Sequence, residues 1–67
     1  MGFIRKQEEN IALKLLEWRY KQQQLPLPEK HVLRQHAADI VSEAHRVARQ
    51  RGGNVVSILK DMISSNR

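Results

Sequence analysis

Apolar residues recur at helical spacing in three segments of the chain, and this pattern predicts three helices, at residues 3–24, 28–51 and 54–64. Pro26 and Pro28 separate the first two segments, and Gly52 and Gly53 separate the last two. The β-branched residues at 55–58 also suit a strand, but the sequence offers no second strand to pair with it. We therefore expect one all-α domain over residues 1–67, a long antiparallel helical hairpin followed by a short third helix.

Apolar side chains cover more than half the circumference of the first predicted helix. At 100° per residue, one stripe contains Ile4, Ile11, Leu15 and Trp18. A second apolar surface contains Leu13, Leu16 and Tyr20. We expect Trp18 to form the main core with Ile11 and Leu15, and the second surface to face either the third helix or a partner protein. The candidate protein interface is Leu13, Leu16, Trp18 and Tyr20.

The second predicted helix has the cleanest separation of apolar and polar residues. Its apolar face carries Ala37, Ala44 and Ala48, which would let a neighbouring helix approach closely. Pro28 suits the first turn of this helix, where its missing N–H costs nothing. After the helix, one of the two glycines is expected in the left-handed conformation, and Asn54 is expected to cap the third helix.

The size of the chain changes the picture, because 67 residues bury a small core. The sequence has no cysteine, so neither disulfides nor thiolate metal sites are available to stabilise it. Small domains without such cross-links depend on close helix packing or on association. We therefore predict a homo-oligomer, most simply a dimer.

The candidate chemistry is sparse. His31, His36 and His45 lack metal-ligand spacing, and His31 and His45 are separated by about 21 Å of helix. Neighbouring carboxylates occur at Glu8 and Glu9, which diverge by 100° on a helix. We predict no enzyme, no cofactor and no metal site. His36 falls on the apolar face of its helix, where protonation would be costly and would make it pH-sensitive.

The net charge of +5 and the pI of about 10.3 favour an anionic partner. Cationic residues collect near the end of the second helix, beside His45, and form a candidate anion or nucleic-acid patch: Arg46, Arg49, Arg51 and Lys60. Cations at this place also complement the helix dipole, so the cluster has a purely structural explanation as well. The apolar runs are too short to span a bilayer, and no signal peptide is visible, so we predict a cytoplasmic protein.

These patterns favour a small, non-enzymatic helical interaction protein that self-associates and that could also bind another protein. The alternative is a basic nucleic-acid-binding protein that uses the outward face of the second helix, including Arg34 and Gln35.

Overall fold

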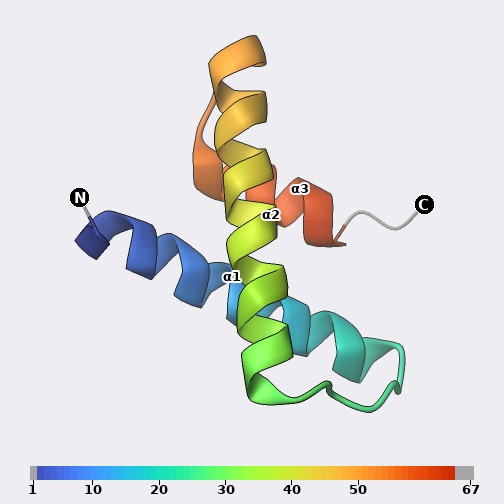
Figure 1. The fold of residues 1–67 in the computed structure, drawn as a ribbon. Coiled ribbons are helices and arrows are strands. Elements are labelled where there is room, and N and C mark those ends of the chain that lie inside the picture. The colour runs from blue at the N-terminus through green and yellow to red at the C-terminus, as the bar shows by residue number, and fades with distance from the viewer. Residues whose placement is uncertain (1, 65–67) are drawn as a thin grey trace.

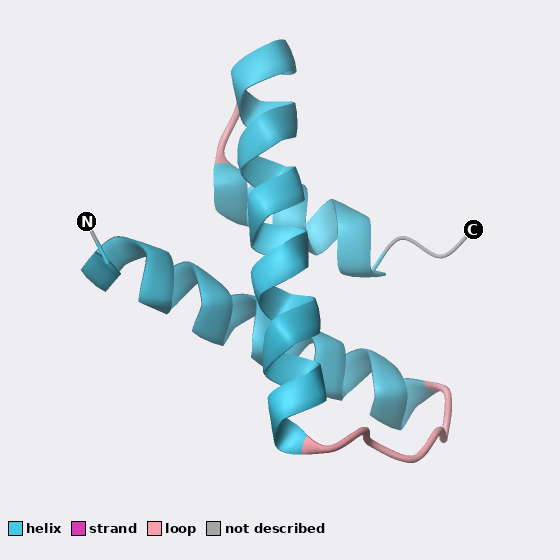
Figure 2. Ribbon diagram, viewed as in Figure 1, coloured by secondary structure: helices cyan, strands magenta, loops and turns pink. Residues whose placement is uncertain are grey.

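The computed structural model describes residues 2–64 and contains three α-helices joined by two connections (Figures 1 and 2). Helix α1 spans Gly2–Gln22, α2 spans Lys30–Arg51 and α3 spans Val55–Ser64. No strand occurs in this range, and residues 55–58 form the start of α3. The prediction of an all-α, three-helix arrangement is therefore confirmed.

Both helices next to the prolines are shorter than predicted. Helix α1 ends at Gln22, and α2 begins at Lys30 after Glu29 in an extended conformation (φ −60°, ψ 153°). The first hydrogen bond of α2 runs from the Leu33 N–H to the Glu29 carbonyl, at 2.9 Å. Pro28 therefore precedes the cap residue and does not lie in the first turn of the helix.

The end of α1 is closed by a left-handed residue that is not glycine. Gln24 has φ 58°, its N–H donates to the Lys21 carbonyl at 3.1 Å, and the Leu25 N–H donates to the Tyr20 carbonyl at 2.9 Å. This pair of bonds is the Schellman arrangement, which satisfies carbonyls at the helix end. It turns the chain out of α1 before the first proline.

The connection between α2 and α3 follows the prediction more closely. Gly52 and Gly53 both have positive φ, 78° and 116°, and the Gly52 N–H donates to the Ala48 carbonyl at 2.8 Å. The Asn54 side chain accepts a hydrogen bond from the Val56 N–H at 2.8 Å. Asn54 is therefore the N-cap of α3, as predicted.

The three helices form two layers. Helix α2 crosses in front of α1 and α3, which lie behind it (Figure 1), and every helix contacts the other two. The molecule measures 33 × 28 × 13 Å. Its short dimension is what two layers need, since packed helix axes lie roughly 8–10 Å apart. The α1–α2 hairpin is open: the two helices cross near their middles (Figure 1).

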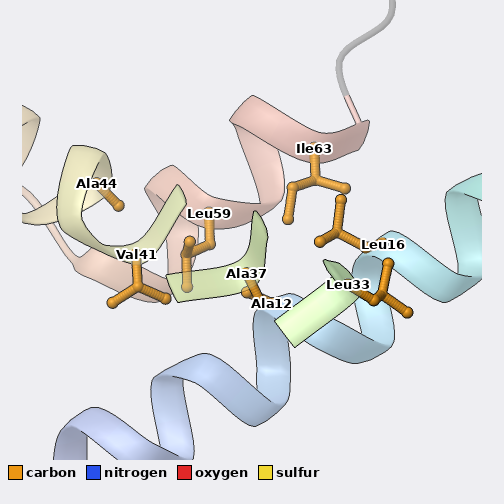
Figure 3. Packing of buried hydrophobic residues seen from close by; sticks show 8 residues of the cluster. All are labelled: Ala12, Leu16, Leu33, Ala37, Val41, Ala44, Leu59 and Ile63. Carbon is orange, nitrogen blue, oxygen red and sulfur yellow. The ribbon is translucent and has the colours of Figure 1, made fainter. Parts of the chain in front are cut away.

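The core is small and lies where the three helices meet (Figure 3). The buried alanines of α1 and α2 let these helices approach closely, as expected for Ala37 and Ala44, whereas Ala48 is only partly buried. Leu59 and Val41 are the largest fully buried side chains. The buried residues are Ala12, Leu16, Leu33, Ala37, Val41, Ala44, Leu59 and Ile63.

Trp18 lies outside this core, so its predicted placement was wrong. Its side chain is 48% exposed, whereas Leu16, two residues earlier, is 5% exposed. Two residues correspond to 200° around a helix, so these side chains point in nearly opposite directions. The inward face of α1 carries Ala12 and Leu16 because the alanine-lined crossing with α2 is too close for an indole ring. Trp18 remains on the outer side.

Candidate functional site

Side-chain chemistry does not single out a catalytic centre in the described part of the chain. Within residues 2–64, no group of three or more His, Asp or Glu side chains is placed to hold a metal ion. His31 is exposed, with Nδ1 3.3 Å from Glu29 Oε1. His36 is also exposed, which contradicts the predicted place on the apolar face. The features that remain are surfaces.

The first surface is an outer stripe on α1, defined by Ile4, Ile11 and Trp18. These residues are spaced by seven, so each lies only 20° around the helix from the one before. The stripe is about 120° from the buried Ala12 and Leu16. Ile4 is 63% exposed, Trp18 is 48% exposed and Ile11 is partly exposed. Both ends of this stripe are therefore accessible.

A shallow hollow lies at the C-terminal end of the outer stripe, and we name it the Trp18 hollow. Its apolar residues are Trp18, Leu25 and Leu27, and the two leucines come from the connection that follows α1. Leu25 and Leu27 are 48% and 55% exposed. Lys14, Glu17 and Lys21 border the hollow. Leu25 and Leu27 fall between the first two predicted helices, so the periodicity of the helices did not reveal this role, although Leu25 continues the seven-residue spacing of the stripe.

The other residues of the predicted interface have intramolecular partners. Leu16 is buried and lies beside Ile63 of α3 (Figure 3), while Leu13 and Tyr20 are partly buried against the core. Of the two alternatives for this surface, the third helix is therefore the one that covers Leu16. Within the predicted interface, Trp18 is the residue that stays widely accessible.

A second depression lies between the three helices, and we name it the three-helix groove. Leu16, Ile40 and Ile63 form its apolar part, and Arg19, Tyr20 and His36 also line it. The Arg19 guanidinium donates to the Ile63 carbonyl and so ties the end of α3 to α1. Because Arg19 makes this contact within the chain, part of the groove serves to hold α3 against α1.

The cations of the predicted anion patch do not all point in one direction. Arg46, Arg49, Arg51 and Lys60 are all exposed, but Arg46 forms an ion pair with Glu43. The hydrogen bond that the Arg46 guanidinium donates to the Glu43 carboxylate lowers the pKa of Glu43 and raises the pKa of Arg46. Arg49 and Arg51 are two residues apart in the last turn of α2 and so point about 200° apart.

His45 belongs to a contact between helices and not to a basic patch. Its Nε2 lies 2.7 Å from Glu8 Oε1, and the Glu8 side chain is 13% exposed. Nearby, the Arg5 guanidinium donates to Glu9 at 3.0 Å and to Ser42 at 2.8 Å. These side chains hold the N-terminal half of α1 against α2. No local sequence pattern predicts a contact between residues 37 positions apart.

No helix in residues 2–64 is long and apolar enough to cross a membrane. Comparisons with protein-family models, curated proteins and solved structures find no match to the chain. The candidate site therefore depends on the geometry of the outer stripe and the Trp18 hollow alone.

Proposed function

We propose that the chain is a non-enzymatic helical interaction protein that self-associates as a dimer through the outer stripe of α1. The observation that carries the proposal is the exposure of Trp18, the single tryptophan of the sequence, next to the exposed Leu25 and Leu27. Tryptophan is enriched among the residues that dominate binding energies at interfaces. Such a protein would act in the cytoplasm by joining two chains and would perform no chemical step itself.

Burial of Trp18 would supply part of the free energy of association. Burying the exposed half of the Trp18 side chain, roughly 100 Å², would contribute on the order of 2 kcal/mol per copy. The intramolecular core contains three alanines among its eight buried residues, so it buries little area. Association would extend that core with Ile4 and Trp18.

Light scattering over a range of protein and salt concentrations tests the proposal. We expect the molar mass to rise towards that of two chains, and Trp18→Ala to shift the equilibrium towards the monomer. Val32→Ala is the matched control, because Val32 is 47% exposed but lies on α2. A mass of one chain at every concentration, or equal effects of the two substitutions, would contradict the proposal.

The salt series also separates this proposal from nucleic-acid binding through the outward face of α2. Each chain carries a net charge of +5, so two copies repel each other, and added salt should strengthen the dimer by screening that repulsion. Binding of phosphates weakens with salt instead, because it releases counterions. The exposed Arg34, Arg49 and Arg51 favour this alternative, whereas the Arg46–Glu43 pair removes one cation from it.

A further inference from the structure

The outer stripe also indicates how two copies would be oriented. We propose that a second copy of this chain packs its α1 antiparallel against the first, with a two-fold axis at Ile11, so that Ile4 of each copy lies against Trp18 of the other. This inference rests on the proposed self-association and adds its geometry. In this arrangement the Trp18 hollow of each copy binds Ile4 of the other.

The spacing of the stripe identifies its occupant as a helix. Side chains that repeat every seven residues stay on one line of contact when two helices wind around each other. Ile4 and Trp18 are 14 residues apart, or about 21 Å along α1, with Ile11 midway between them. A two-fold axis at Ile11 therefore brings residue 4 of each copy level with residue 18 of the other, so that the pair contains two equivalent Ile4–Trp18 contacts. The two exposed ends of the stripe cover each other in a single self-complementary contact.

Charges beside the stripe favour the antiparallel orientation. Lys14 and Lys21 border one side of it, and Arg19 lies on the other side. These three cations and Glu17 lie in residues 12–22 and give the C-terminal half of α1 a net charge of +2, whereas residues 2–11 contain two cations and two carboxylates. In a parallel pair the two cationic halves would lie level with each other and repel. In an antiparallel pair each cationic half lies opposite the half of the other copy that has no net charge, and Lys14 is nearly level with the uncharged Gln7.

Site-directed cross-linking tests the orientation. Because the sequence has no cysteine, an introduced cysteine is the only thiol in each variant. The variants are Gln7→Cys and Lys14→Cys, at two exposed positions of α1. With the axis at Ile11, residue 7 of one copy is about one residue, or ~1.5 Å, from the level of residue 14 of the other. Two copies of residue 7 are offset by about 12 Å along the helix, and two copies of residue 14 by about 9 Å. Gln35→Cys, on the outward face of α2, measures cross-linking by random collision.

The reagent is a short bis-maleimide, and the products are counted by intact mass. We expect a mixture of Gln7→Cys and Lys14→Cys to give mixed dimers severalfold above either variant alone and above the Gln35→Cys background. Cross-linking of each variant with itself, at or above the mixed yield, would indicate a parallel pair and overturn the inference. A dimer by light scattering with all yields at background would also overturn it but would leave self-association standing. A monomer at every concentration would overturn both proposals.

Discussion

His45 Nε2 lies 2.7 Å from Glu8 Oε1 and joins α2 to the N-terminal half of α1. Because the Glu8 side chain is largely buried, its carboxylate depends on this partner in place of water. The contact therefore adds to the interactions that hold α1 and α2 together where they cross.

We expect His45→Ala to lower the free energy of unfolding by about 1–2 kcal/mol, since it leaves a largely buried carboxylate without its hydrogen bond. Denaturant unfolding of His45→Ala, Glu8→Gln and the double variant would measure the coupling. Glu9→Gln is the control, because Glu9 pairs with Arg5 within α1, where such pairs contribute only about 0.2–0.5 kcal/mol. A coupling no larger than the Glu9→Gln effect would mean that the contact is not formed in solution.

The position of Trp18 predicts a smaller effect on the stability of the monomer than a core residue has. Trp18→Ala should lower the free energy of unfolding by about 1–2 kcal/mol, because only half of the side chain, roughly 100 Å², is covered in the monomer. Leu59→Ala, at a fully buried position, should cost about 2–5 kcal/mol. Both are measured by chemical unfolding at protein concentrations where light scattering shows one chain. A loss of about 3 kcal/mol or more for Trp18→Ala would show that Trp18 is part of the core.

The left-handed residue at the end of α1 offers a stabilising substitution. In this conformation a residue other than glycine loses about 1–2 kcal/mol of stability to steric strain. A glycine avoids that strain but loses about 0.4–1 kcal/mol of stability through the larger entropy of the unfolded chain. The first cost exceeds the second, so Gln24→Gly should raise the free energy of unfolding by about 0.5–1 kcal/mol. Thermal unfolding would show a higher midpoint.

Gln23→Gly is the matched control for this substitution, because Gln23 adjoins Gln24 but does not have a positive φ. It should lower the midpoint, since there the glycine brings only the entropic cost. If both variants were destabilised alike, the left-handed conformation of Gln24 would be absent in solution.

The Glu43–Arg46 pair predicts a local pH dependence. Because the pKa of Glu43 is lowered by the Arg46 hydrogen bond, the pair adds stability above the ordinary carboxyl pKa and loses it as the pH falls through the lowered value. The effect on unfolding should be small and screened by salt, since both side chains are exposed. A titration of the Glu43 carboxyl followed by NMR should show the lowered pKa, and Arg46→Gln should return it to the ordinary range. An unchanged pKa in that variant would contradict the pairing.

The sequence was sufficient for the parts of the fold that depend on neighbouring residues. The helical periodicity, the Asn54 cap, the glycine turn and the close approach of Ala37 and Ala44 all follow from local patterns. The candidate site was less accessible. Helix α1 has two apolar surfaces, and periodicity does not tell which one faces inward. The stripe that contains Trp18 was expected to form the core, whereas the surface that contains Leu16 does.

The remaining differences come from contacts between distant residues and from an unusual conformation. The Glu8–His45 contact depends on the crossing of α1 and α2, which no single segment determines. The left-handed turn at Gln24 could not be predicted, because the position lacks the glycine that usually marks this conformation in a sequence. The stripe of Ile4, Ile11 and Trp18 was visible in the sequence, but its outward orientation was not; a search for seven-residue repeats would have added Leu25 to it.

In a two-layer molecule where α2 alone covers both α1 and α3, no helix has an independent set of neighbours. Withdrawing α3 would uncover Leu59 and Ile63 and open the space above Leu16, and withdrawing α2 would leave α1 and α3 with only each other. Because every helix contacts the other two, withdrawing any one helix breaks two of the three helix–helix interfaces. The amide protons in the middle of α2 should exchange with solvent through the global event alone, so that this domain has a single unit of cooperativity.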